Sequence, residues 1–314
     1  MCRAQRRLTE RGEKVARYLN KPKLAEWSSL VIVVSLTLVT VTWLADLVQQ
    51  KASYFFDGDE GLHAYEALRV SAFLHDGDLA GASTASVMDW FYPPVHPWLL
   101  GAALTLYPVT HVSVRLFSLA IYALDVLLLY ALGRWLARET RWPWLAGLAA
   151  ALMALMAPPV WVMGSIVYIE LLGVLFMLVA FWGYWQGVKG REWGWLVAGL
   201  GVVAIWLTKY PYWVFLIVSL ALAIHSRTDW RALIKRLIWL MLPSAVVILA
   251  WVLWPMTRSG LFGRIAETAQ MAESTWRTLL TCLAFYLRSI LFQFSPSRLI
   301  AAGLVVALVA SLAR

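Results

Sequence analysis

Two short stretches of this chain carry the side chains best suited to chemistry. The first is residues 55–63, FFDGDEGLH, and the second is residues 90–97, WFYPPVHP. The first stretch places Asp59 beside Glu60 in a chain of which only 14% is charged. Acidic groups are costly to keep near lipid, so a cluster of them in a hydrophobic chain usually marks a working site. The two stretches therefore predict proton transfer or ligand binding at a membrane surface.

The acidic pair opens a segment, residues 60–75, whose sequence predicts a helix. Asp59, His63 and Glu66 follow one another at four- and three-residue steps, so they are expected on one side of that helix. Asp59 and Glu60 also have a purely structural interpretation. Carboxylates favour the first turn of a helix because of its free backbone N–H groups and its macrodipole. On the pair alone, both interpretations stay open.

Two further charged residues stand out because apolar sequence surrounds them. Glu170 begins an apolar segment, and Lys209 interrupts the run WLTKYP at 206–211. Lys209 could simply extend its ammonium group to the membrane interface, or it could bind an anionic partner such as a phosphate. His63 and His96, taken singly, are interpreted as interfacial hydrogen-bonding residues, with ligand binding as the alternative.

Metal and nucleotide chemistry have weaker support in the sequence. Asp59, His63 and Glu170 could form a mixed oxygen and nitrogen metal site, so a divalent metal is an option, and no cofactor is required. The Asp-Gly-Asp triplet at 76–78 lacks the rest of an EF-hand pattern and favours a turn. The sequence contains no Walker-type loop, dinucleotide fingerprint or nucleophile elbow. Nucleotide-driven chemistry is therefore not expected.

The composition indicates what must position these groups. The chain has 314 residues, of which 61% are hydrophobic, and its mean hydropathy is +0.69. Repeated long apolar runs predict an all-α polytopic membrane protein. The net charge of +9 comes from short loops and the N-terminus. That distribution is a topology signal of membrane proteins and argues against a nucleic-acid partner.

The positive-inside rule orients the chain. Residues 1–26 are predicted to be a basic cytoplasmic extension, and residues 27–314 a transmembrane domain whose first span, 27–48, is a retained anchor. The segment 49–114 then becomes the first outer loop. Within it, the short apolar segment 94–107 lies on or dips into the outer face, because counting it as a span would move the later basic loops outside. The other predicted spans bring the total to about nine crossings: 116–136, 144–163, 170–186, 193–208, 212–225, 237–254, 279–294 and 299–312.

The order of these motifs resembles the first outer loop and following spans of GT-C glycosyltransferases. This type includes the protein O-mannosyltransferases and the aminoarabinose transferase of lipid A. The resemblance extends over about 27–225. The matching stretches are Asp59-Glu60 at a helix start, DGDL at 76–79, YPPVHPWL at 92–99, RLFS at 115–118, Glu170 at the start of a span, and LTK at 207–209.

The resemblance implies a GT-C-like fold with juxtamembrane helices in the outer loop. It also implies a sugar donor on a polyprenyl or dolichyl phosphate, used on the outer side of the membrane. Asp59 is then expected to be the general base that deprotonates an acceptor hydroxyl. Glu60 and Glu170 are expected to take part in catalysis by orienting the acceptor or by binding a divalent ion. The residues expected to bind substrate or lipid phosphate are His63, Tyr92, His96, Arg115 and Lys209.

The chain also departs from the family pattern. Glu170 replaces the commoner Asp, Tyr210 replaces the glycine before the family's proline, and Tyr92 stands where the aminoarabinose transferases have Lys. Many relatives continue into a soluble outer domain, whereas this sequence ends at Arg314. It is expected to be either a compact member or a shortened sequence.

The alternative function is a non-enzymatic membrane subunit or scaffold whose outer loop binds a partner protein. A transporter would keep polar groups near the middle of the bilayer, whereas here they gather at its outer edge, which favours the enzyme. The expected location is a multi-pass position in a prokaryotic plasma membrane with a cytoplasmic N-terminus. The expected partners are membrane lipids, the lipid-linked donor, and an acceptor that is a protein, a lipid or a glycan.

Overall fold

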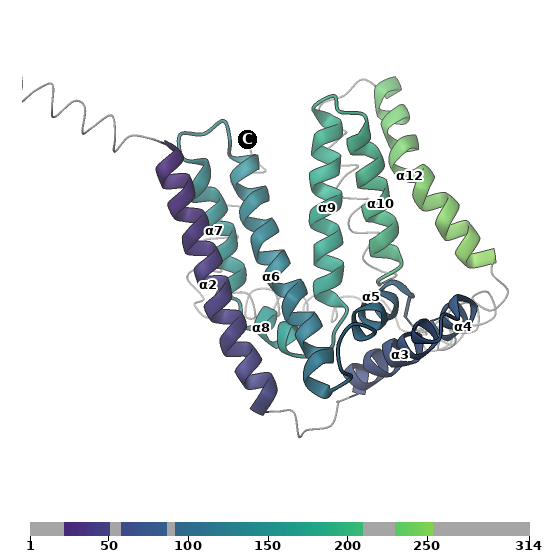
Figure 1. Cartoon of the computed structure of the whole chain (residues 1–314). Coiled ribbons are helices and arrows are strands. Elements are labelled where there is room, and N and C mark those ends of the chain that lie inside the picture. Colours follow the sequence, from purple (N-terminus) through teal and green to yellow (C-terminus); the bar gives the residue numbers. More distant parts are fainter. Residues whose placement is uncertain (1–21, 51–57, 87–91, 210–229, 254–314) are drawn as a thin grey trace, which may run out of the picture. The chain divides into compact units, whose positions relative to one another are not determined.

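The computed structural model describes residues 22–50, 58–86, 92–209 and 230–253, and every regular element in these ranges is an α-helix. The prediction of an all-α chain is confirmed for this part of the sequence. Figure 1 labels the helices, which are α2 (Pro22–Gln50), α3 (Gly58–His75), α4 (Leu79–Ala85), α5 (Val95–Leu104), α6 (His111–Leu136), α7 (Pro143–Leu155), α8 (Pro158–Ser165), α9 (Glu170–Val188), α10 (Trp193–Trp206) and α12 (Trp230–Leu253).

Three of these helices are long and apolar enough to cross a membrane. They are Leu24–Gln50 within α2, all of α6, and all of α9, and they coincide with three predicted spans. A bent pair, α7 and α8, could make a fourth span among the described residues. The total of about nine crossings stays a prediction, because the predicted spans 212–225, 279–294 and 299–312 lie outside the described residues.

The predicted span 144–163 is not one straight helix. The structure divides it into α7 and α8, which meet at 64°. Ala157, between them, has extended backbone angles, and Pro158 and Pro159 occupy the first turn of α8. The prolines explain the break, because they lack the N–H groups that would continue α7 and their rings clash with the preceding turn.

Helices α9, α10 and α12 lie side by side (Figure 1). Their shared core includes Ala180, Tyr184, Trp195 and Leu240. Small residues allow close contact between α9 and α10: a Cβ on Gly183 would lie 2.6 Å from the backbone nitrogen of Ala198. Helix α10 is apolar, but its 14 residues are fewer than a membrane-spanning helix needs. Helix α12 begins earlier than the predicted start at 237 and contains Pro243.

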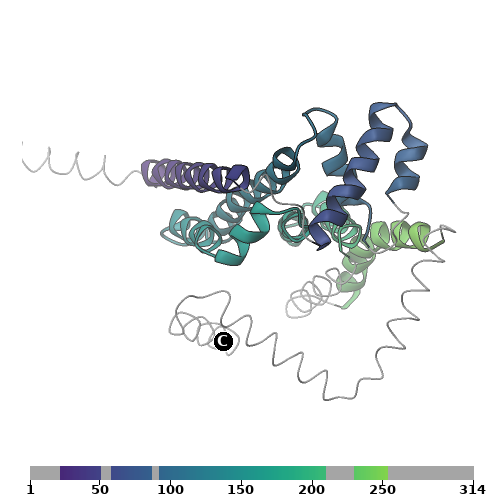
Figure 2. The same cartoon turned by 90° about the horizontal axis from the view of Figure 1, so that it is seen from below.

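Helices α3, α4 and α5 pack against one another and are drawn in dark blue in Figure 2. The predicted helix 60–75 is confirmed as α3, and the short segment 94–107 contains the ten-residue α5. A Cβ on Gly101 would lie 2.9 Å from the carbonyl oxygen of Ala67, so α5 approaches the backbone of α3 closely. The turn predicted at 76–78 is also present: Gly77 has φ +73°, and Asp78 caps α4 by accepting a hydrogen bond from the Gly81 N–H at 2.8 Å.

The chain divides into two compact units. Among the described residues, the first contains 22–41 together with 126–156. Within it the Glu26 carboxylate pairs with Arg134 Nη2 at 2.8 Å, and the hydroxyls of Ser29 and Tyr130 share a hydrogen bond of 2.8 Å. The second unit contains the remaining described residues, which are 42–50, 58–86, 92–125, 157–209 and 230–253. All the residues of the candidate site belong to this second unit.

Candidate active site

The two adjacent carboxylates at the start of α3 have different surroundings. Gly58 begins the helix with φ +23°, and Asp59 and Glu60 occupy its first turn. Asp59 is exposed, whereas Glu60 is only 4% exposed. Both carboxylates suit the first turn of a helix, which agrees with the structural interpretation of the sequence. Of the two, only Asp59 is exposed and can contact a substrate directly.

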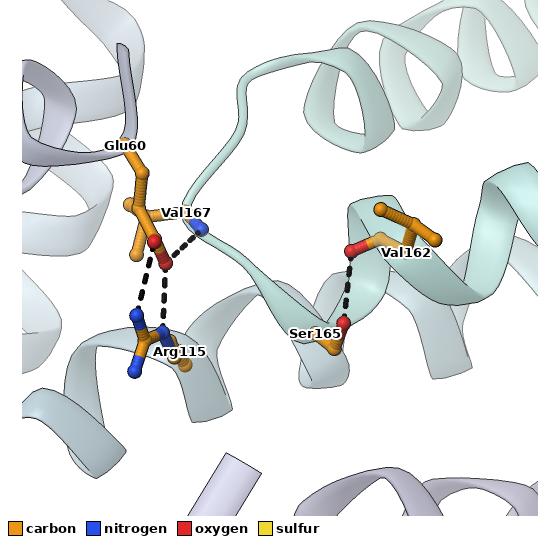
Figure 3. A network of polar contacts seen from close by, with 5 residues as sticks. All are labelled: Glu60, Arg115, Val162, Ser165 and Val167. Carbon is orange, nitrogen blue, oxygen red and sulfur yellow. Dashed lines mark hydrogen bonds and ion pairs between the residues drawn. The ribbon is translucent and has the colours of Figure 1, made fainter. Parts of the chain in front are cut away.

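Glu60 is held by a buried network that joins three segments (Figure 3). Arg115 of α6 donates from Nε to Glu60 Oε1 at 2.8 Å and from Nη2 to Oε2 at 3.0 Å. The backbone N–H of Val167, between α8 and α9, donates to the same Oε1 at 3.0 Å. Such a two-pronged guanidinium–carboxylate pair fixes direction as well as distance. It therefore fixes the start of α3 against α6 and the segment before α9.

A second ion pair joins the start of α9 to the segment after α10. Lys209 Nζ donates to Glu170 Oε1, and both side chains keep part of their surface exposed. The backbone N–H of Val95 donates to the carbonyl of Leu207 at 3.0 Å. This bond ties the beginning of α5 to the chain just before Lys209. Three separate segments thus converge at this end of α9.

Tyr92 connects the exposed carboxylate with the second ion pair. Its hydroxyl donates a hydrogen bond to Asp59, and the charges of Lys209 and Glu170 act on it as well. Burial, followed by the negative charge of Asp59, raises the pKa of Tyr92 to about 12. Tyr92 therefore stays protonated and remains a hydrogen-bond donor to Asp59. Asp59, Tyr92, Glu170 and Lys209 form a group, which we call the polar cluster.

The two predicted histidines lie beneath this cluster rather than on its surface. The ring centroid of His63 lies 4.4 Å from that of Tyr92 and 5.4 Å from that of His96. Both imidazoles are 1% exposed. Burial, with a smaller contribution from His63, lowers the pKa of His96 to about 3. His96 is therefore neutral at physiological pH. The His63 ring packs against Tyr92, and the His96 ring packs against His63.

The structure does not gather the proposed metal ligands. Among the described residues, no three His, Cys, Asp or Glu side chains are placed to hold a metal ion. Glu170 forms an ion pair with Lys209, and His63 Nδ1 lies 3.9 Å from Glu66 Oε2. The set Asp59, His63 and Glu170 is thus not assembled as a ligand group, and metal dependence stays a prediction.

One buried acidic residue was not selected from the sequence. Asp125 lies in the candidate span formed by α6 and is 3% exposed. Neither of its carboxylate oxygens accepts a hydrogen bond from any residue that the structure describes. Tyr122 and Ser118 lie on the same helix face, one and two turns earlier. An acidic residue inside a predicted span was the available signal, because such groups are rare and usually functional.

Apolar helices with a polar cluster at one end define an integral multi-pass membrane protein with a candidate active site. The model of the dolichyl-phosphate-mannose-protein mannosyltransferase family matches residues 92–254, just over half of the chain, and the chain belongs to this family. The family is one of membrane glycosyltransferases of the GT-C kind, so the resemblance noted in the sequence is confirmed at the family level. No significant match was found among curated proteins or among solved structures.

The matched segment begins at Tyr92, so it contains most of the site residues but not α3. Tyr92, Glu170 and Lys209 lie inside the match, whereas Asp59 lies before it. Asp59 joins the other three through its hydrogen bond with Tyr92. The contact between Asp59 and Tyr92 therefore places the Asp59 carboxylate beside residues of the segment that matches the family.

Proposed function

We propose that this protein transfers a sugar from a polyprenyl or dolichyl phosphate donor to a hydroxyl group of an acceptor at the outer face of the membrane. The observation that carries this proposal is the polar cluster. An exposed carboxylate, a protonated phenol and a lysine converge there from distant parts of the chain. The family description, which names a dolichyl-phosphate sugar, supports the donor class.

In the proposed reaction, Asp59 accepts the proton of the acceptor hydroxyl. The acceptor oxygen then bonds to the anomeric carbon of the sugar, while the bond between that carbon and the phosphate oxygen breaks. The products are the glycosylated acceptor and the polyprenyl phosphate. Asp59 is exposed, so it can pass its proton to solvent afterwards. The hydrogen bond from Tyr92 orients the carboxylate toward the acceptor.

Lys209 is the proposed partner of the donor phosphate. The leaving phosphate gains negative charge as the bond breaks, and a positioned cation stabilises that charge. Glu170 holds the ammonium group in place before the donor binds. The pair is part-exposed, so an incoming phosphate can reach the ammonium group without opening the protein core.

Glu60 and Arg115 receive a different role from the one expected on sequence alone. Both side chains are 5% exposed and each satisfies the other's charge. We assign them to positioning, because their bond fixes the first turn of α3 and with it Asp59. We therefore do not place Glu60 at the reacting atoms or Arg115 at the donor phosphate.

The charge distribution along α9 supports the outer-face assignment. Glu170 and the polar cluster lie at its beginning, and Lys189 and Arg191 follow its end at Val188. Basic residues favour the cytoplasmic ends of spans. The opposite end of α9, with the polar cluster, is then on the outer side, as the proposed reaction requires.

The direct test is sugar transfer by the purified protein from a synthetic polyprenyl-phosphate sugar, in the parent and in Asp59→Asn. The matched control is Asp76→Asn, which removes another exposed carboxylate from the turn after α3. We expect loss of transfer in the first variant and full activity in the second. Equal activity of Asp59→Asn and the parent would remove Asp59 from the mechanism. An inactive parent with no bound polyprenyl phosphate, but with a tightly co-purifying protein, would favour a non-enzymatic subunit.

A further inference from the structure

An apolar groove lies beside the first turns of α6. It has a volume of about 670 Å³, and its walls come from the end of α5, the loop that follows, and residues of α6 between 112 and 120. Leu104, on one wall, is buried, whereas Leu116 and Ala120 are exposed. None of the described residues that line the groove carries a charge. The groove therefore suits a hydrocarbon chain rather than a sugar or a phosphate.

The walls of the groove are fixed by contacts within the protein. The backbone N–H of Ser113 donates to Thr110 Oγ1 at 3.0 Å, and that of Thr110 donates to Ser113 Oγ at 2.9 Å. Ser113 Oγ also donates to the carbonyl of Pro108 at 2.7 Å. These bonds cap the start of α6 and hold the loop against it. On the inner side, Phe117 packs against the buried cluster that contains Leu104. A preformed groove lowers the entropic cost of binding a ligand.

The mouth of the groove faces lipid. Helix α6 is long and apolar enough to cross a membrane. Leu116, Ala120 and Leu124 are exposed and follow one another at four-residue steps, so they form one exposed apolar side of α6. The loop after α5 also exposes Leu106, to 77%, and Val109. Large apolar side chains exposed together mark a membrane-contacting surface. A ligand of the groove therefore enters from the bilayer.

The groove lies on the Asp59 side of the proposed site. Arg115, next to Leu116 of the groove, holds Glu60 and the first turn of α3. Leu104 shares a buried cluster with Ala64, one turn further along α3. Lys209 follows the segment that is bonded to the first residue of α5, whereas the groove is at the other end of this ten-residue helix, about 15 Å away. The groove is therefore remote from the proposed phosphate partner.

The direction of the proposed reaction separates the two substrates in the same way. In a direct displacement, the attacking oxygen and the leaving group lie on opposite faces of the sugar. With the donor phosphate at Lys209, the acceptor then approaches from the side of Asp59, where the groove lies. A hydrocarbon chain in the groove thus belongs to the acceptor rather than to the donor.

We propose that the groove holds the hydrocarbon chain of a membrane lipid whose free hydroxyl is the acceptor. The hydroxyl gives its proton to Asp59, and its oxygen bonds to the anomeric carbon. The bond from that carbon to the phosphate oxygen breaks, and polyprenyl phosphate leaves. This inference rests on the proposed function and narrows the acceptor from a protein, a lipid or a glycan to a lipid.

The first test is photo-crosslinking of the full-length protein in detergent. The probe is a diacylglycerol with a diazirine in one acyl chain, and the comparison probes are phosphatidylcholine and polyprenyl phosphate with the same photoreactive group. Peptide mapping by mass spectrometry locates the label. We expect diacylglycerol to label residues 103–120 in preference to phosphatidylcholine, because only diacylglycerol brings a free hydroxyl to Asp59. An excess of polyprenyl phosphate should not compete.

Ala120→Trp fills the groove and tests it directly. Labelling by diacylglycerol should fall roughly tenfold, as expected when about two methylene groups lose their burial. The matched control is Ala131→Trp, at another exposed position of α6 that does not line the groove. With diacylglycerol as acceptor, Ala120→Trp should raise the acceptor KM by a similar factor and leave the donor KM unchanged. Circular dichroism and gel filtration of each variant establish that folded proteins are compared.

Several results would overturn the proposal. Preferred labelling by polyprenyl phosphate would assign the groove to the donor, and equal labelling by phosphatidylcholine would make it a general lipid surface. Labelling by none of the probes, or an equal loss in both tryptophan variants, would exclude a lipid site. Transfer to a serine-containing peptide that Ala120→Trp leaves unchanged would overturn the lipid acceptor but keep the proposed function. No transfer to any acceptor, with diacylglycerol still bound, would instead reject the proposed function and the acceptor role with it.

Discussion

The two ion pairs near the start of α3 and α9 have the same chemistry but different environments. Glu60 and Arg115 are each 5% exposed and are joined by two parallel hydrogen bonds. Glu170 and Lys209 are 20% and 28% exposed, and they act on Tyr92 next to Asp59. The comparison shows that the buried pair is suited to holding the backbone, whereas the part-exposed pair remains available to a ligand.

The physical reason is desolvation. A deeply buried pair is balanced only while both charges are present, and removal of one leaves an uncompensated charge in a low-dielectric interior. A part-exposed pair is screened by solvent, so its lysine can exchange a carboxylate for a phosphate at modest cost. The following predictions separate the two roles, beginning with the exposed carboxylate that both pairs help to place.

Asp59→Asn should cause the largest loss of activity. A positioned general base typically contributes about 10²- to 10⁴-fold, so we expect a fall of kcat within that range. Asp59 is exposed, so the variant should fold as the parent does. Steady-state transfer and a melting curve measure both effects. A melting temperature that falls together with activity would contradict a purely chemical role.

Glu60→Gln should reduce stability more than any other change in the site. Breaking a buried ion pair on one side costs about 3–5 kcal/mol. The control is Glu26→Gln, which breaks the more exposed pair with Arg134. We expect it to lower the free energy of unfolding by at most about 1 kcal/mol. Thermal or denaturant unfolding in detergent measures the difference. Equal effects of the two substitutions would show that burial does not distinguish these pairs.

Lys209→Met should weaken use of the lipid-phosphate donor. Loss of one charge-assisted hydrogen bond is worth about 1.5–3 kcal/mol, or roughly 10- to 150-fold in kcat/KM. Lys209→Arg should recover part of this loss, because it keeps the positive charge. Arg141→Met, at an exposed position after α6, is the control and should leave transfer unchanged. If Lys209→Arg were as impaired in transfer as Lys209→Met, the result would argue against phosphate binding by Lys209.

His96 should make folding stability sensitive to acid. Its pKa is about 3 in the folded protein, against an ordinary value of 6.5. Below pH 6.5 the unfolded chain therefore takes up a proton that the folded chain does not. This contribution to stability is complete above pH 6.5 and falls toward pH 3, by about 2 kcal/mol at pH 5. Melting temperatures between pH 7.5 and 5 should fall less in His96→Gln. Parallel curves would exclude His96 as the cause.

Tyr92→Phe should have the smallest effect. It removes the hydroxyl that donates to Asp59 but keeps the ring that packs on His63. A single hydrogen bond is worth about 0.5–1.5 kcal/mol, so kcat should fall roughly two- to tenfold. Tyr65→Phe, on the exposed side of α3, is the control and should be neutral. A fall as large as that of Asp59→Asn would give Tyr92 a direct part in the chemistry.

Local sequence information predicted much of the fold. Apolar length identified the helices that became α2, α6 and α9, and the acidic start of residues 60–75 identified α3. The same rules missed the break before Pro158, because the hydropathy of 144–163 was read without giving weight to the two prolines. They also passed over Asp125, whose single charge does not interrupt the hydropathy of its span.

The sequence by itself determined that a membrane protein carries Asp59, Glu60, Glu170 and Lys209 near the ends of apolar segments. Local patterns could not separate Asp59 from Glu60, because adjacent residues of similar charge share every local signal, and only the family resemblance favoured Asp59 as the general base. Only the tertiary structure decided that Glu60 turns inward to Arg115, 55 residues away, while Asp59 stays exposed beside Tyr92. Periodicity describes one helix at a time, whereas burial and ion pairing depend on which distant helices pack together.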